Sequence, residues 1–155
     1  MDISELEGQA SRLIVPRFAE AEAWWLGNWL VQKAMAGKLP IAIDIRTPDR
    51  TLFHVSLPGA TPANDLWVRR KSNTAYLVQK ASLIVRLQLE AKGQAMERHG
   101  TSPADYVASG GAVPIVVRGV GMVATATVSG LPDVDDHALV VEGIAALIDW
   151  AATQV

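Results

Sequence analysis

Apolar and polar residues alternate with a period of two over residues 41–46, which predicts a half-buried β-strand. A Thr-Pro-Asp-Arg turn follows, and residues 52–57 form the predicted antiparallel partner. A second hairpin is predicted from residues 113–118 and 120–128, joined by a two-residue turn at Arg118-Gly119. Two hairpins separated by helical segments favour an α+β fold with an antiparallel sheet over a doubly wound parallel sheet.

Helical periodicity fills most of the remaining chain. The predicted helices are 2–11, 19–36, 63–79, 81–98 and 134–152. Residues 12–18 are apolar but contain Pro16, so they are expected to form an edge strand or an extended lead-in. Short joints containing Pro or Gly connect these segments, and a long linker is not seen, so a single domain is expected over residues 1–155.

Two of the predicted helices carry more apolar surface than one buried face requires. Residues 134–152 are apolar nearly all round, including Trp150, as expected of a helix covered on both sides. In residues 19–36, Trp25 and Trp29 are expected to point away from the core. The positions expected to face or border the core are Leu26, Leu30 and Ala34, with Trp24, Val31 and Met35 beside them. We therefore expect a homo-oligomer; the alternative is that residues 2–18 or 81–98 cover these faces.

Composition excludes several classes of protein. The chain has 155 residues, of which 50% are hydrophobic and 19% charged, and its formal net charge of -2 provides no field that would attract nucleic acid or an anionic membrane. No cysteine is present, which excludes disulfides, thiolate metal sites and cysteine nucleophiles. The apolar runs are too short for a membrane helix, and the acidic start is not that of a secretory signal, so a cytoplasmic protein is expected.

Local motifs for familiar chemistries are missing. His137 and Glu142 lie on different sides of one predicted helix, so they cannot share a metal ion locally, and no metal site is predicted. Ser129, Asp136 and His137 have the residue types of a hydrolase triad, but no Gly-x-Ser-x-Gly motif surrounds the serine. The acidic residues beside His137 equally suit a helix N-terminus without any catalysis.

Basic residues on residues 63–79 suggest anion binding. Arg69-Arg70-Lys71 spread over about 200° of a helix, so only one or two of them can face a single ligand. Such a side chain would hold a carboxylate or phosphate through charge-assisted hydrogen bonds. A solvated basic face is the alternative interpretation.

Several motifs taken together resemble an uncharacterised branch of the heme-degrading-domain superfamily, alongside proteins of the GlcG, HbpS and PduO C-terminal type. The motifs are Leu52-Phe53-His54, residues 57–65, Trp67, Arg69-Arg70-Lys71, Gly110-Gly111 with Pro114, Ser129-Gly130-Leu131 and Asp136-His137. The resemblance covers residues 12–150 and implies a five-stranded antiparallel sheet flanked by helices, in an α/β/α arrangement, and higher oligomers. Some members bind heme or iron, so heme is the cofactor that the resemblance suggests. Two positions differ from the family pattern: Ala81-Ser82 stands where relatives carry a serine pair, and Ser109 where many carry histidine.

These observations predict one small-ligand pocket. Its expected residues are His54, Asn64, Arg70, Lys71, Arg118, Asp136 and His137. Arg70 and Lys71 would take the charge of an anionic or heme-like ligand, and His137 would titrate near neutral pH. Three function classes follow: a binding module for a small molecule or heme, an enzyme acting on heme or a small organic acid, and a scaffolding oligomer without ligand. No catalytic residue is assigned.

Overall fold

The structure, a computed structural model, describes residues 1–154. Its helices are α1 (Ile3–Arg12), α2 (Glu20–Ala36), α3 (Pro62–Val78), α4 (Ser82–Ala91), the 3-10 helix η1 (Met96–His99) and α5 (Asp133–Thr153). Its strands are β1 (Ile14–Val15), β2 (Ala42–Arg46), β3 (Thr51–Ser56), β4 (Ala112–Val117) and β5 (Gly121–Ser129). The predicted α+β class is confirmed. No helix within residues 1–154 has both the length and the apolar character needed to cross a bilayer.

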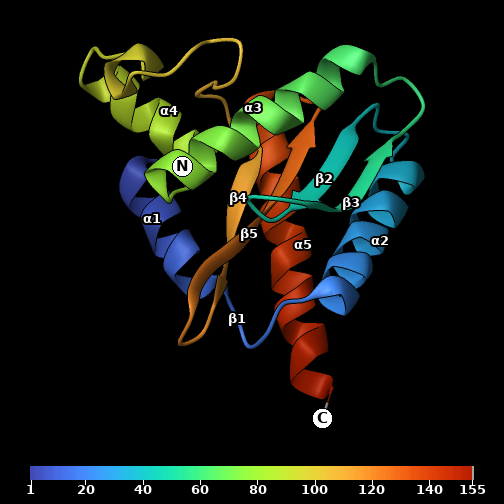
Figure 1. Cartoon of the computed structure of the whole chain (residues 1–155). Helices are drawn as coiled ribbons and strands as arrows, with labels where there is room; N and C mark the ends of the chain where they lie inside the picture. Colours follow the sequence, from blue (N-terminus) through green and yellow to red (C-terminus); the bar gives the residue numbers. More distant parts are fainter. Residues whose placement is uncertain (155) are drawn as a thin grey trace.

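The five strands form one sheet in the order β1-β4-β5-β2-β3 (Figure 1). Four of its strands pair antiparallel, as predicted, with Ala42 of β2 opposite Ser129 of β5 and Ser56 of β3. The edge strand β1 pairs with β4 in parallel, Ile14 lying opposite Val116. Because most of the chain separates these two strands, no hairpin imposes an antiparallel direction on them.

The two faces of the sheet differ in polarity, because successive residues of a strand project to opposite sides. On one face, Ala126 and Val128 of β5 belong to the main hydrophobic core, which α2 and α5 complete. On the other face, Thr125, Thr127 and Ser129 are buried polar residues beneath α3. In Figure 1, α3 crosses in front of the sheet and α5 lies behind it. The polar face is the one that carries the candidate site.

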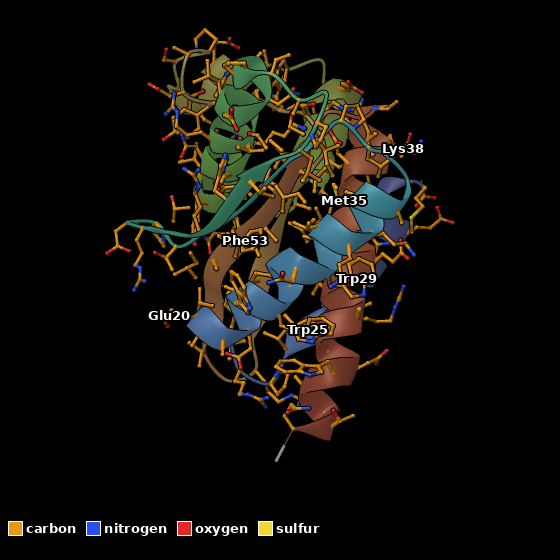
Figure 2. The ribbon with its side chains drawn as sticks, turned by 90° about the vertical axis from the view of Figure 1, so that its right-hand side faces the viewer. Glu20, Trp25, Trp29, Met35, Lys38 and Phe53 are labelled. Carbon is orange, nitrogen blue, oxygen red and sulfur yellow. The ribbon has the colours of Figure 1, made fainter. Side chains whose placement is uncertain are left out.

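The prediction of which tryptophans point away from the core is wrong. The Trp25 indole stacks on Trp150 of α5 with ring centroids 5.0 Å apart, and Figure 2 shows Trp25 and Trp29 on the side of α2 that faces α5. Trp24 and Met35, expected beside the core, are instead 67% and 53% exposed. Since α2 is apolar over most of its circumference, periodicity did not determine which flank faces α5.

Two further boundaries differ from those predicted. The helix predicted over 81–98 is interrupted, because Gly93 adopts a left-handed φ of +62° and the Gln94 amide donates back to the Leu89 carbonyl at 2.9 Å. The turn between β4 and β5 has three residues, since Val117 pairs with Gly121. The two-residue turn predicted there is therefore wrong, although Gly119 does take a positive φ, +76°.

Candidate functional site

Helix α3 positions two candidate residues on one flank. It begins after Thr61 with Pro62, whose fixed φ suits a first helical position, and the Asn64 side-chain oxygen accepts a hydrogen bond from the Thr61 amide at 2.9 Å. Lys71 follows Asn64 by seven residues, about two turns of helix, so the two side chains lie on the same side. Both point towards the end of β5 and the start of α5.

Lys71 forms a buried ion pair with Asp136. The Lys71 ammonium lies 3.0 Å from a carboxylate oxygen of Asp136 and also donates to the Val128 carbonyl at 3.1 Å. The other carboxylate oxygen of Asp136 accepts from the Leu131 amide at 2.9 Å. Both side chains are almost completely buried, at 3% and 1% exposure. The pair connects α3, β5 and α5, three elements that are distant in sequence.

Burial changes the proton affinity of both partners. Loss of hydration lowers the pKa of Lys71, and the charge and hydrogen bond of Asp136 offset part of this effect. Loss of hydration likewise raises the pKa of Asp136, against the opposing influence of Lys71 and of the Leu131 and Gly130 amides. Each charge is therefore retained only through its partners, so the pair is sensitive to the removal of either member.

A cavity of about 270 Å³ opens beside this pair, and we call it the polar pocket. It is lined by Asn64, Trp67, Lys71, Ser109, Ser129, Gly130, Leu131, Asp133 and Asp136. The Asn64 amide nitrogen donates to the Ser129 hydroxyl at 3.5 Å. Asp133 accepts from Arg86 at 2.7 Å and from the Gly110 amide at 2.9 Å. Both carboxylates of the pocket thus have a cationic partner, Lys71 for Asp136 and Arg86 for Asp133.

Arg70 is a further cation, and it packs on Trp67, a residue that lines the polar pocket. Its guanidinium carbon lies 4.9 Å from the centroid of the Trp67 ring, and Trp67 forms one wall of the pocket. The Arg70 Nε atom is buried without a hydrogen-bond partner. An acceptor placed beside this buried donor would form a hydrogen bond with it and remove the free-energy cost of leaving it unpaired.

The Gly110-Gly111 segment is packed against the site. Both glycines are buried, and Gly111 has a φ of +138°. A Cβ atom on Gly111 would overlap the Val128 carbonyl oxygen and would lie 2.9 Å from the Lys71 ammonium. The absence of a side chain there allows the backbone to approach the ion pair closely.

His54 lies in a neighbouring cluster and not in the polar pocket. Its Nδ1 atom lies 2.8 Å from a carboxylate oxygen of Asp44 of β2 and its Nε2 atom 2.8 Å from one of Asp65 of α3, and the protonated imidazole can donate to both. Ser56 also donates to Asp65, and Arg46 donates to Asp44. Desolvation opposes protonation of His54, but the hydrogen bonds and charges of the two carboxylates outweigh it and raise its pKa.

This shift predicts how the contribution of His54 to stability depends on pH. Because the folded pKa lies above the ordinary value of 6.5, the stabilisation is complete below about pH 6.5 and is lost as the pH rises through the folded pKa. His54→Gln is therefore expected to lower the free energy of unfolding at about pH 5.5 and to lower it by a much smaller amount at about pH 9. Urea unfolding at both pH values measures this difference. The exposed His99→Gln is the control, and an equal loss at both pH values for His54→Gln would contradict the prediction.

Two other predicted site residues lie elsewhere. His137 follows Asp136 directly, but neighbouring helical residues diverge by about 100°, and its imidazole bonds Gln9 of α1 at 2.9 Å. Arg118 lies in the β4–β5 turn, where its amide donates to the Val15 carbonyl at the opposite end of β4 from Ala112. Of the seven predicted residues, the structure brings Asn64, Lys71 and Asp136 into the polar pocket. Arg70 does not line the pocket and is connected to it through the Trp67 ring, and His54 bonds Asp65, the residue that follows Asn64.

Sequence reasoning missed several polar side chains of this region. The omitted lining residues with polar side-chain atoms are Trp67, Ser109, Ser129 and Asp133, and the His54 cluster adds Asp44 and Asp65. Asp44 at the centre of the predicted strand 41–46 was the available signal. A carboxylate buried on a sheet face needs hydrogen-bonding or charged partners, so its presence indicates a polar cluster there. No group of His, Asp or Glu side chains within residues 1–154 is arranged to hold a metal ion.

Comparison with known sequences shows which proteins the chain resembles. Residues 18–145 match the family described as "Haem degrading protein HbpS-like". A UPF0303 protein of Streptomyces avermitilis is 46% identical over 143 residues, covering 92% of this chain and 88% of that relative. A UPF0303 protein of Rhizobium rhizogenes is 43% identical over 144 residues, covering 93% of this chain and 89% of the relative.

Solved structures share the fold. The crystal structure of the Ybr137w protein superposes with a TM-score of 0.87 at 27% identity, covering 98% of this chain and 90% of that one. The PduOC:heme complex superposes with a TM-score of 0.70 at 19% identity, covering 83% of this chain and 94% of that one. The second likeness establishes the common architecture alone.

Proposed function

Because the chain belongs to the HbpS-like family of heme-degrading proteins, we propose that it is a binding module whose polar pocket takes a small carboxylate. The observation that carries the proposal is the buried Lys71–Asp136 pair beside a cavity of about 270 Å³. A cavity of this size suits a small ligand, since drug-sized molecules occupy roughly 300–1,000 Å³.

The charges around the pocket favour an anion. Lys71 and Arg86 neutralise the two lining carboxylates, so Arg70 is the cation left over at the wall formed by Trp67. The unpartnered Nε of Arg70 and the Asn64 amide can donate to carboxylate oxygens. The Trp67 indole offers an apolar surface for the ligand body.

Binding of benzoate at low ionic strength, measured by isothermal titration calorimetry, tests the proposal. Arg70→Gln is expected to weaken benzoate binding about tenfold or more, because a charge-assisted hydrogen bond is worth about 1.5–3 kcal/mol. Arg69→Gln is the matched control: Arg69 is the preceding residue and pairs with Asp105 outside the pocket. Equal losses in the two variants, or no saturable binding to the unmodified protein, would refute the proposal. Recovery of chemically altered benzoate would indicate an enzyme and not a binding module.

Heme does not fit the polar pocket. Heme iron requires an axial side chain such as His, Cys, Met or Tyr, and the lining of the pocket contains none of these. Both ring nitrogens of His54 are already bonded to carboxylates, and the His137 Nε2 atom is bonded to Gln9. A hemin titration is therefore expected to give no Soret shift that saturates at one heme per chain. A saturating shift that disappears in His54→Ala or His137→Ala would reverse this conclusion.

We also propose that copies of the chain associate into a homo-oligomer through the outer flank of α2. The support is the exposure of Trp24 and Met35 on one side of this helix, next to the half-buried Val31. Burying an exposed aromatic side chain contributes about 2–3 kcal/mol, which makes this flank a favourable contact surface.

Sedimentation velocity at micromolar concentration tests the oligomer. We expect particles heavier than the 16.6 kDa chain, and dissociation in Trp24→Glu because the introduced charge would be buried at the contact. Leu77→Glu, at an exposed apolar position of α3, is the control and should leave the particle mass unchanged. A single 16.6 kDa species in the unmodified protein would reject the oligomer.

A further inference from the structure

A second cavity, of about 250 Å³, lies beneath α1, and we call it the apolar cavity. Its walls are mainly aliphatic and come from α1, α4, β4 and β5. The principal wall residues are Leu6, Leu13, Ile84, Val116 and Met122. It contains none of the polar-pocket residues, so the two cavities are separate sites.

Among the polar lining residues, His137 and Gln9 form a hydrogen-bonded pair, whereas Glu7, Gln79 and Lys80 are exposed. The His137 Nε2 atom lies 2.9 Å from the Gln9 side-chain oxygen, and both residues line the apolar cavity. The imidazole is only 4% exposed, and burial lowers its pKa to about 4 against the influence of Asp133. His137 is therefore neutral at pH 7. Its Nδ1 atom is buried and has no hydrogen-bond partner, so the pair has a hydrogen-bonding position that no protein group fills.

Helix α1 closes this cavity with few contacts to the rest of the protein. Leu6 is its one buried residue, and it packs with Ala81, Leu83 and Ile84 in a cluster separate from the main core. The family match begins at residue 18, after α1 and β1. The α1 wall of the apolar cavity therefore lies outside the matched region, whereas the walls from α4, β4 and β5 lie within it.

We propose that the apolar cavity binds a small uncharged molecule with an apolar body and one hydroxyl group, of the alkylphenol class. A dry cavity of about 150 Å³ already admits benzene, so the larger space here accommodates a ring with a short alkyl chain. When His137 donates its Nε2 proton, the Gln9 oxygen retains a second lone pair that can accept from the hydroxyl group.

The charges around the cavity argue against an ionic ligand. Its two charged lining residues, Glu7 and Lys80, are exposed and of opposite sign. A ligand charge placed among the aliphatic walls would lose hydration without gaining a partner. A neutral ligand avoids this cost.

Calorimetric titration with three matched compounds, 4-propylphenol, propylbenzene and 4-propylbenzoate, tests the proposal. We expect saturable binding of 4-propylphenol, with 4-propylbenzoate and propylbenzene each weaker by about tenfold, a change equivalent to about 1.4 kcal/mol. Ala10→Phe, which places a ring in the cavity from α1, should abolish binding. Ala21→Phe, an exposed position of α2, is the size-matched control and should bind normally.

The hydrogen-bonding role requires a separate variant. Gln9→Leu removes the acceptor while filling a similar volume, and it should equalise the affinities of 4-propylphenol and propylbenzene. Circular dichroism and thermal unfolding establish that each variant remains folded. Tighter binding of the benzoate, no saturable binding of 4-propylphenol, or retained binding in folded Ala10→Phe would overturn the proposal. Arg70→Gln should not alter binding of 4-propylphenol, so failure of the polar-pocket proposal is distinguishable from failure of this one.

Discussion

Lys71→Met is expected to lower the free energy of unfolding by about 3–5 kcal/mol, because it leaves the Asp136 carboxylate buried without its cation. The aliphatic part of the side chain remains, so the loss reports on the charge and not on a cavity. Urea unfolding monitored by tryptophan fluorescence measures the change. Lys80→Met is the matched control, since Lys80 is exposed and its removal should cost less than about 0.5 kcal/mol.

A double variant separates the ion pair from the packing around it. Lys71→Met combined with Asp136→Leu removes both charges, and it should recover a large part of the stability lost in the single variant. If the double variant is as unstable as the sum of the two single changes, the pair does not act as a unit. The Leu131 amide loses its acceptor in that variant, so full recovery is not expected.

Gly111→Ala is expected to destabilise the protein by roughly 3–5 kcal/mol. Its φ of +138° is strained for any residue with a side chain, and the added methyl group would overlap the Val128 carbonyl oxygen. The overlap also forces the Lys71 ammonium to move, so the effect reaches the ion pair. Thermal and urea unfolding measure the loss.

Gly119→Ala separates backbone strain from overlap. Gly119 also has a positive φ, +76°, but nothing lies within 4 Å of an added Cβ atom. Gly119→Ala should therefore lower the free energy of unfolding only by the backbone strain of a positive φ, about 1–3 kcal/mol. If Gly111→Ala proves no worse than Gly119→Ala, the close approach at Gly111 has no energetic role.

Much of the fold could be predicted from local patterns. Alternation identified β2, and helical periodicity placed α3 to within one residue at each end, because both patterns are short-range properties. The interruption at Gly93 was not predicted, since an isolated glycine is also tolerated inside a helix. The parallel pairing of β1 depends on contacts distant in sequence, which periodicity does not encode.

The candidate site could be predicted only in part. Asn64 and Lys71 share a helix flank, a local relation, but their meeting with Asp136 depends on how α3 and α5 approach β5. His137 was grouped with Asp136 because the two are adjacent in sequence. One step along a helix turns the side chain by about 100°, and this rotation places His137 in the apolar cavity instead.

The opposite faces of β5 have a consequence for how such a domain can change during evolution. Substitutions at Thr125 or Ser129 alter the chemistry presented to α3, whereas Ala126 and Val128 remain within the core. Polar positions that face α3 and apolar core positions therefore alternate along the same strand, and Ser129 is the one of the three polar residues that lines the polar pocket. Ser129 is the position where a substitution changes the pocket wall directly, whereas replacing the fully buried Thr125 would also leave Ser72 without its hydrogen-bond partner and so cost stability.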